Sequence, residues 1–456
     1  MAFETINPAT GDVLAAYELM RKDEALAMAQ KAKVAFQAWK ELSINQRLAY
    51  FTRLGEVLRQ NKQRYGEMMT KEMGKPITQA VAEVEKCAWL CDVLAEKAKS
   101  WLAPEEVEAD GKQHLITFEP LGPIYIVMPW NYPFWQPFKV ALPLMAAGNV
   151  TLLKHARNVT GCALFVEEAF LKAGFPHGTF QTLIIDHDTS AALVQSDDVA
   201  ACSLTGSVGA GAKIASQAGA QIKKVVLELG GSDPLIVLDD ADLDKAVAGA
   251  VLGRTSNAGQ VCIGSKRIIV HKNIADEFTS AFAKAMQDLK VGDPMDPQTQ
   301  VGPLVNEDAV KDMLVFVDDA KAKGAQVLVG GKRPQGLNGA YFEPTVLVNT
   351  KKDMKAVCEE TFGPIAPIIV VDSDEEAIAV ANDSEFGLSA TIWSKDLARA
   401  QHVAKKLNTG AVFINAISKS HPYLPIGGIM KSGYGRELSH IGIKEFTNIK
   451  TINVYE

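Results

Sequence analysis

The sequence has no long apolar run, no targeting segment and no block of like charge. Its most apolar segment, residues 140–153, is interrupted by Pro143, Gly148 and Asn149, whereas a membrane-spanning helix needs about 20 apolar residues in succession. The net charge of −7 is spread along the chain, without the basic tail or stripe that is typical of nucleic-acid binding. The first residues match neither a signal peptide nor a transit segment. We therefore expect a cytoplasmic protein that binds neither membranes nor nucleic acid.

Cysteine and histidine are too few to build a disulfide framework or a metal cluster. The chain has six cysteines among 456 residues, far fewer than in disulfide-rich domains. Its eight histidines show no ligand spacing, so we expect no metal. Cys87 and Cys91 lie one helical turn apart and could form a metal pair, but no further ligand lies near them in the sequence. Two packed thiols are the favoured interpretation.

Strand and helix patterns alternate along most of the chain. Residues 22–101 have helical periodicity. The buried apolar runs "GPIYIVMPW" and "NVTLLKHA" then flank the helical segment 134–147, an order that predicts a parallel crossover. The pattern continues to residue 231, which predicts a doubly wound α/β domain. A second α/β set begins at "DPLIVLDD", whereas "KQHLITFEPLG" and the final "FTNIKTINVYE" alternate like isolated strands. The final strand has no partner in its own neighbourhood, so we expect it to extend a sheet in another subunit.

Two strand ends point to a dinucleotide site. In "LTGSVGAG" a strand runs into a helix, so Gly206, Ser207 and the free N–H groups of the first turn could bind an anion. This segment does not match the G-x-G-x-x-G fingerprint. A glycine-rich turn between a strand and a helix is as often a simple connection as a binding site. Lys154 ends the strand "NVTLLK", at the edge where open α/β sheets bind ligands. A solvated terminal lysine is the alternative.

Three residues could carry the chemistry. Cys262 in "NAGQVCIGS" lies between glycines, and a thiol is a strong nucleophile even when little of it is ionised. Glu228 ends the apolar strand "VLELGG" and could act as a base. Asn131 in "MPWNYP" could donate to an oxyanion. Each alone has an ordinary alternative: a structural thiol, a solvated carboxylate and a turn amide.

Together the three residues predict aldehyde oxidation. The Cys262 thiolate adds to the carbonyl carbon, while Asn131 and the Cys262 backbone N–H hold the oxyanion. A hydride leaves for a nicotinamide, and Glu228 activates the water that hydrolyses the resulting thioester.

Seven motifs in order, over nearly the full length, resemble the aldehyde dehydrogenase superfamily: "PWNYP", "LLKHA", "TGSVGAG", "LELGG", "NAGQVC", "EETFGP" and "PIGGIMKSGYGRE". The resemblance implies that Cys262 is the nucleophile, Glu228 the general base and Asn131 the oxyanion donor. It also implies three parts: a dinucleotide-binding domain, a catalytic domain and a β arm that pairs subunits into a homodimer or homotetramer. Their predicted bounds are 1–105 with 121–231, 232–437, and 106–120 with 438–456.

The resemblance also implies a cofactor site. Lys154 would bind the adenosine ribose, Glu360 the nicotinamide ribose, and Phe362 would pack near the nicotinamide. The full predicted set is Trp130, Lys154, Arg157, Ser207, Val208, Leu229, Glu360 and Phe362. Arg157 stands where the family commonly has a Glu that repels a 2′-phosphate, and an Arg could attract one instead. We therefore expect NADP to be accepted as well as NAD. The loop "GSVGAG" also lacks the usual Thr after the Ser.

The motif wording is most similar to compact bacterial succinate-semialdehyde dehydrogenases. Lys139 would be the cation for the far carboxylate, as a point charge where relatives have Arg, and Ser418 and Ser420 would contact the substrate. Ser256 stands where some of these enzymes have a second Arg. Uncharged or aromatic aldehydes are the alternative, through an aromatic mouth of Phe134, Trp135 and Phe138.

Two rival functions share this fold. A CoA-acylating dehydrogenase keeps the cysteine but generally lacks the base in "ELGG", so Glu228 favours hydrolysis. A non-catalytic binding protein would need none of the three reactive residues, because the fold alone does not imply activity.

Overall fold

Two sheets with parallel strands organise the molecule, and the computed structural model describes residues 2–456. The first sheet has the order β19-β9-β8-β5-β6-β7, parallel except at β19. Its central strands β5, β6 and β8 are almost entirely buried, as is typical of a sheet covered on both faces, whereas β9 is buried only over its last three residues. The strands are β5 (Pro123–Met128), β6 (Val150–His155), β7 (Phe180–Thr182), β8 (Ala201–Thr205), β9 (Lys224–Glu228) and β19 (Gly433–Tyr434).

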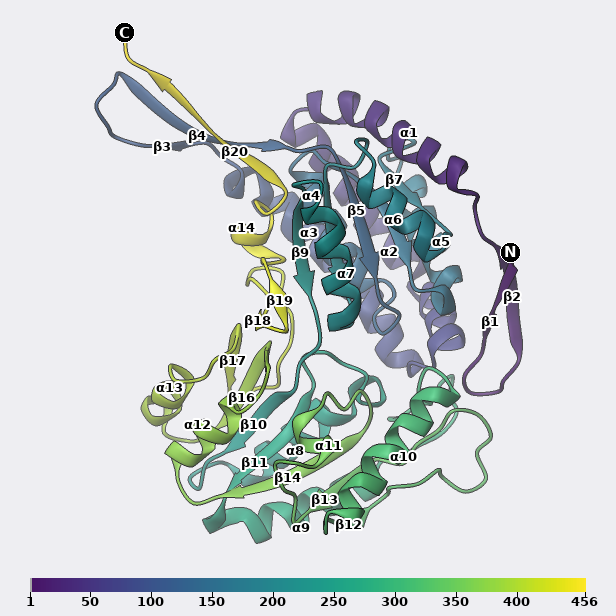
Figure 1. Cartoon of the computed structure of the whole chain (residues 1–456), viewed down its shortest axis with the longest axis vertical. Coiled ribbons are helices and arrows are strands. Elements are labelled where there is room, and N and C mark those ends of the chain that lie inside the picture. The colour runs from purple at the N-terminus through teal and green to yellow at the C-terminus, as the bar shows by residue number, and fades with distance from the viewer. Residues whose placement is uncertain (1) are drawn as a thin grey trace.

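Helices connect these strands and pack on the sheet (Figure 1). The connecting helices are α4 (Trp135–Ala146), α5 (Thr160–Lys172), α6 (His187–Gln195) and α7 (Val208–Gly219). Before them come α1 (Lys22–Glu41), α2 (Ile44–Met73) and α3 (Ile77–Trp101). Helix α2 begins at the capping box of Ser43 and Gln46 and ends at Gly74, whose φ of 79° is the left-handed cap that glycine favours. None of the described helices is both long and apolar enough to cross a membrane.

The second sheet has the order β12-β13-β14-β11-β10-β16-β17, with β12 antiparallel. Its strands are β10 (Asp233–Val237), β11 (Ser265–His271), β12 (Gln326–Val329), β13 (Thr345–Val348), β14 (Ile365–Val371), β16 (Ser389–Trp393) and β17 (Ala411–Ile414). Its longer helices are α8 (Leu243–Thr255), α9 (Ala275–Gln287), α10 (Glu307–Ala322), α12 (Asp374–Asn382) and α13 (Leu397–Ala404). In Figure 1 this sheet fills the lower half of the molecule and the first sheet the upper half. The predicted α/β architecture is therefore confirmed.

A narrow arm projects from the first sheet (Figure 1). It consists of β20 (Thr447–Val454), β4 (Gln113–Pro120) and β3 (Glu105–Glu106). Strand β20 pairs antiparallel with β4 over eight residues, from Thr447 opposite Pro120 to Val454 opposite Gln113. The sequence predicted that the final strand has no partner in its own neighbourhood, and its partner β4 indeed comes from a segment more than 300 residues earlier. The outer edge of β20 has no strand partner within residues 2–456.

Several short elements complete the structure. The sequence pattern did not predict the N-terminal hairpin of β1 (Ala2–Ile6) and β2 (Val13–Glu18), because its strands are largely exposed and show little apolar alternation. In Figure 1 the hairpin lies on the side opposite the arm. The remaining strands and helical turns are β15 (Phe386–Gly387), β18 (Ile429–Met430), α11 (Lys355–Cys358), α14 (Ser439–Gly442), η1 (Arg157–Val159), η2 (Ser256–Gly259) and η3 (Lys272–Ile274).

Candidate active site

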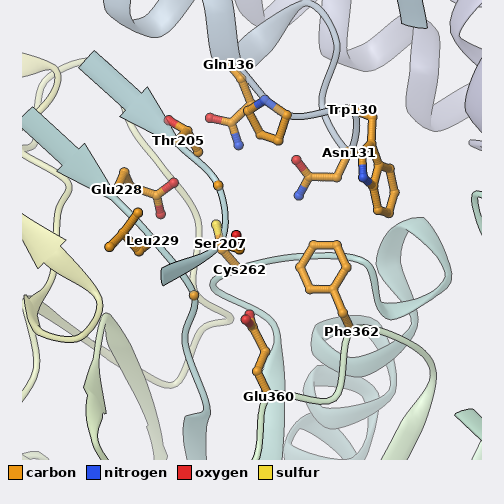
Figure 2. A pocket seen from close by; sticks show the side chains of 13 residues that line it. Trp130, Asn131, Gln136, Thr205, Ser207, Glu228, Leu229, Cys262, Glu360 and Phe362 are labelled. Carbon is orange, nitrogen blue, oxygen red and sulfur yellow. The ribbon is translucent and has the colours of Figure 1, made fainter. Parts of the chain in front are cut away.

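Cys262 lies where two cavities meet. The first, of about 210 Å³, is lined by Asn131, Glu228 and Cys262 together with predicted cofactor residues. The second, of about 130 Å³, is lined by Cys262 and by residues of α3, α4 and the loop after β17. Asn131 and Glu228 come from the carboxyl ends of β5 and β9, the edge at which open α/β sheets bind ligands. In Figure 2 the carboxylate and the amide face the sulfur from opposite sides.

The loop before Cys262 is held in an unusual backbone conformation. Asn257, Ala258 and Gly259 have φ of 51°, 53° and 77°, three successive residues in the left-handed region. Residues with a Cβ rarely adopt this conformation, and it persists only where the surroundings impose it. The fully buried Arg254 guanidinium supplies part of that support by donating to the Gly259 carbonyl at 2.8 Å. The glycine therefore allows the turn that presents the thiol.

The six cysteines differ in accessibility: four are buried, Cys262 is partly accessible and Cys358 is exposed. Of the two accessible cysteines, only Cys262 lines the two cavities. Cys87 and Cys91, predicted to be packed helix thiols, are both completely buried, whereas Cys262 keeps part of its surface accessible. Burial and then the negative charge of Glu228 raise the pKa of the Cys262 thiol, against the smaller opposing effects of Lys139 and Lys266. The thiol is therefore neutral at pH 7 and needs a base to become a nucleophile.

Glu228 is placed to supply that base. Its carboxylate is 1% exposed, and neither oxygen has a hydrogen-bond partner among the described residues. A buried carboxylate without partners is costly unless a ligand or water fills the gap. Asn131 Nδ2 donates one hydrogen to the Gln260 carbonyl at 3.0 Å, which fixes the amide and leaves its second hydrogen for an oxyanion. The structure thus brings Cys262, Glu228 and Asn131 together; their catalytic roles stay predictions.

Lys139 is not a free cation. It is 2% exposed, and its Nζ lies 2.7 Å from Glu437 Oε2 and 3.6 Å from Glu228 Oε2. Burial alone would lower the pKa of Lys139, but the two carboxylates outweigh burial and raise it. Lys139 does reach the wall of the second cavity, yet its charge is already balanced. These ion pairs count against its predicted role in binding the substrate carboxylate and favour a role in holding Glu228.

The first cavity gathers most of the predicted cofactor residues. Trp130, Ser207, Leu229, Glu360 and Phe362 all line it (Figure 2). The Phe362 ring meets the Trp130 ring edge-on at 5.6 Å between centroids. Glu360 accepts the Gly231 N–H at 3.1 Å. The Ser207 hydroxyl caps its own helix by accepting from Ala210 N at 3.3 Å, and Val208 is the first residue of that helix, α7.

The adenosine end of the predicted site is rich in cations. Lys154 is the next-to-last residue of β6, where burial and then the charge of Arg157 lower its pKa. Its ammonium has no carboxylate within 4.0 Å in the described part of the chain. Arg157 is exposed and lies over the Phe3 ring, 5.5 Å from the centroid. Burial and then the charges of Lys154, Arg157 and Lys213 lower the pKa of His187. The charges of Lys154, Arg157 and Lys213 fit the anionic end of a dinucleotide. The sequence analysis missed His187 and Lys213, because neither lies in a recognisable motif.

The second cavity contains the predicted substrate residues Ser418 and Ser420. The Ser418 hydroxyl accepts from Ser389 Oγ at 2.7 Å. The Ser420 hydroxyl accepts from Lys86 Nζ at 2.7 Å. Lys86 was also missed, because it lies on α3, far from Cys262 in the sequence, and in "EKCAWLCDV" only its position beside a cysteine stands out.

Known proteins with similar sequences and structures extend this picture. The family model described as "Aldehyde dehydrogenase family" matches residues 1–452. A protein of Synechocystis sp. named probable succinate-semialdehyde dehydrogenase (NADP+) is 47% identical over 454 residues, 99% of each chain. An Escherichia coli K12 protein named succinate semialdehyde dehydrogenase (NAD(P)+) is 45% identical over 448 residues, 98% of this chain and 97% of that one. The crystal structure of succinic semialdehyde dehydrogenase from Streptococcus pyogenes with NADP+ has a TM-score of 0.97 at 38% identity and covers 100% of both chains. The chain therefore belongs to the aldehyde dehydrogenase family.

Proposed function

We propose that this protein oxidises succinate semialdehyde to succinate with NADP or NAD as the hydride acceptor. The observation that carries the proposal is the position of Cys262 between two cavities, one lined by the cofactor residues and the other by cationic and hydroxyl groups. A thiol at such a junction can hold a carbonyl carbon between an oxidant and a binding pocket. The names of the similar proteins support both the substrate and the cofactor.

Each reacting residue has one task in this reaction. Glu228, whose oxygens have no hydrogen-bond partner, takes the thiol proton, and the Cys262 sulfur adds to the aldehyde carbon to give a thiohemiacetal. Asn131 Nδ2 and the Cys262 backbone N–H donate to the oxyanion. When bound, the nicotinamide supplies the acceptor for the hydride that leaves this carbon, so that a thioester remains on Cys262. Glu228 must first release the thiol proton to solvent. The ionised carboxylate then deprotonates a water, which hydrolyses the thioester to the acid and releases the thiol.

The second cavity argues against the alternative of a bulky aromatic aldehyde. Phe134 and Phe138, which were to form an aromatic mouth, are completely buried, and only Trp135 of that set lines the cavity. The cavity has a volume of about 130 Å³. A short aldehyde fits this space better.

The test is a comparison of two aldehydes of equal length. Purified enzyme is assayed with succinate semialdehyde and with butanal, which has a methyl group in place of the carboxylate, each with NADP and NAD. We expect kcat/KM to be at least about tenfold higher for succinate semialdehyde, since one charged hydrogen bond is worth about 1.5–3 kcal/mol. The product should be free succinate. Equal or better turnover of butanal would contradict the substrate, and an acyl-CoA product formed only with CoA would contradict hydrolysis.

We also propose that the arm joins copies of this chain into a homodimer or homotetramer. Strand β20 offers an edge whose backbone groups are not paired within the described chain, and Ile449 and Ile452 on it are 62% and 43% exposed. A second copy can continue the sheet there, which would hide an edge that otherwise invites aggregation. The three-part domain division and the cytoplasmic location stay predictions of the sequence.

A further inference from the structure

Lys86 is a cation in the second cavity without an acidic partner. It projects from α3, its Nζ donates to Ser420 Oγ at 2.7 Å and lies 4.2 Å from the centroid of the Trp135 ring. No carboxylate of residues 2–456 comes within 4.0 Å of that nitrogen. Burial lowers the pKa of Lys86 to about 8, so at neutral pH the group is mostly charged but poorly solvated.

The neighbouring buried lysines differ from Lys86 in this respect. Lys75 pairs with Glu83, Lys139 with Glu437, and Lys266 with Glu360. Glu83, on the same helix as Lys86, is not available as a further partner. Its second oxygen accepts the backbone N–H groups of Phe134 and Trp135, at 2.9 Å each, at the start of α4. A desolvated charge without a counterion is unfavourable, so a ligand is the remaining source of one.

We propose that Lys86 and Ser420 bind the far carboxylate of a short ω-carboxyl aldehyde whose carbonyl carbon reacts at Cys262. This inference rests on the proposed function and names the residues that select its substrate. The Ser420 hydroxyl accepts from Lys86 and so keeps its own hydrogen to donate to a carboxylate oxygen. The Trp135 ring holds the ammonium from the apolar side through a cation–π contact.

The composition of the cavity favours one negative charge on the ligand. Phosphate sites typically use the several donors of Arg or of a helix N-terminus, whereas Lys86 supplies a single point charge beside one hydroxyl. Lys419 also lines the cavity but is exposed to solvent, and the charge of Lys139 is balanced by Glu437. A neutral aldehyde would leave Lys86 uncompensated, and this cost provides discrimination.

The first experiment compares Lys86→Met with the wild type on succinate semialdehyde and butanal. Methionine keeps the length and apolar stem but removes the charge. We expect kcat/KM for succinate semialdehyde to fall about 10- to 100-fold, mainly through KM, because a charged hydrogen bond is lost. Butanal oxidation should not fall, and its persistence shows that the variant is folded. Ser420→Ala should give a smaller loss in the same direction, and the matched control Lys99→Met, at an exposed position farther along α3, should change neither substrate more than about twofold.

A second measurement needs no variant. The pH dependence of kcat/KM reports the ionisation of groups in the free enzyme. Both aldehydes react with Cys262, so the ionisation of this thiol affects both values of kcat/KM equally and cancels in their ratio. The ratio should be high below pH 8 and fall as Lys86 loses its proton. The other titratable groups that face Lys86 are Glu83 and Cys87 on α3, Lys139 on α4, and Lys419 and His421 after β17. Burial and the Lys419 and Lys86 charges lower the pKa of His421, so His421 stays neutral throughout the range.

The outcomes separate this inference from the proposed function. A wild type that does not prefer succinate semialdehyde to butanal overturns the proposed substrate. The wild type can prefer succinate semialdehyde while Lys86→Met keeps this preference and the wild-type kcat/KM ratio stays flat between pH 7 and 9. That combination overturns the role of Lys86 but not the proposed substrate. If the preference for succinate semialdehyde is lost in Lys419→Met but kept in Lys86→Met, the role of Lys86 is also overturned. Lys419 would then be the residue that binds the substrate carboxylate.

Discussion

At the scale of single residues, the site depends on which charges are balanced. Glu228 approaches Lys139, and Lys139 also holds Glu437, so the base lies in a buried chain of charges beside the thiol. Lys86 stands outside this chain. The sequence could predict Cys262, Glu228 and Asn131 because each lies in a short motif next to a strand: Glu228 at the end of β9, Asn131 just after β5 and Cys262 just before β11. It could not separate Lys86 from Lys139, because their partners come from segments far apart in the chain.

Removing the charge of Glu228 should make the thiol more reactive while it slows turnover. Burial and the Glu228 carboxylate raise the pKa of Cys262, so Glu228→Gln should lower that pKa and increase the thiolate fraction at pH 7. Alkylation of Cys262 by iodoacetamide should become faster, whereas steady-state NADPH production should stop after one burst. Unchanged steady-state turnover would exclude Glu228 as the base for thioester hydrolysis, and an unchanged rate of alkylation would contradict its effect on the thiol pKa.

Lys139→Met should act in the opposite direction on the thiol. The Lys139 charge lowers the pKa of Cys262, so its loss should raise that pKa and slow alkylation at pH 7. If Lys139 bound the far carboxylate, as the sequence predicted, this variant would affect only succinate semialdehyde. The ion pairs with Glu228 and Glu437 imply instead that butanal oxidation slows as well. A loss confined to KM for succinate semialdehyde would instead support the role that the sequence predicted.

At the scale of elements, the strand ends bring the site together. Strands β5, β6, β8 and β9 were predictable because each is a buried apolar run, and parallel strands place their carboxyl ends at one edge. The exposed strands β1 and β2 could not be predicted from the sequence, since they lack apolar alternation. The pairing of β20 with β4 joins distant parts of the chain, and local pattern contains no information about such pairing.

Arg157, just after β6, should determine how strongly NADP binds relative to NAD. Arg157→Glu places a carboxylate beside Lys154, so it should weaken NADP much more than NAD, because only NADP has a 2′-phosphate. The dissociation constants can be measured by fluorescence titration without aldehyde. Lys284→Glu on α9, which makes the same change of charge on the other sheet, serves as control. Equal weakening of both cofactors would remove Arg157 from the phosphate site.

At the scale of the whole molecule, the arm projects beyond the body of the first sheet (Figure 1), and the proposal that it joins subunits can be tested there. Ile449→Lys with Ile452→Lys puts charge on the exposed edge strand, which should oppose strand pairing between copies. Light scattering after size-exclusion chromatography should then give a mass close to that of one 49.2 kDa chain. Lys450→Gln, between the two positions, is the control. An unchanged multiple of the chain mass would place the subunit contact elsewhere.

The most direct test of the whole account is the mass of the Cys262 peptide from Glu228→Gln enzyme after mixing with succinate semialdehyde and NADP. Because the nucleophile and the oxyanion donors remain while the base for hydrolysis is removed, the peptide should carry one succinyl group, sensitive to hydroxylamine as a thioester is. Wild-type enzyme treated in the same way should show little of the adduct. An unmodified Cys262, or a succinyl group on another cysteine, would contradict the account.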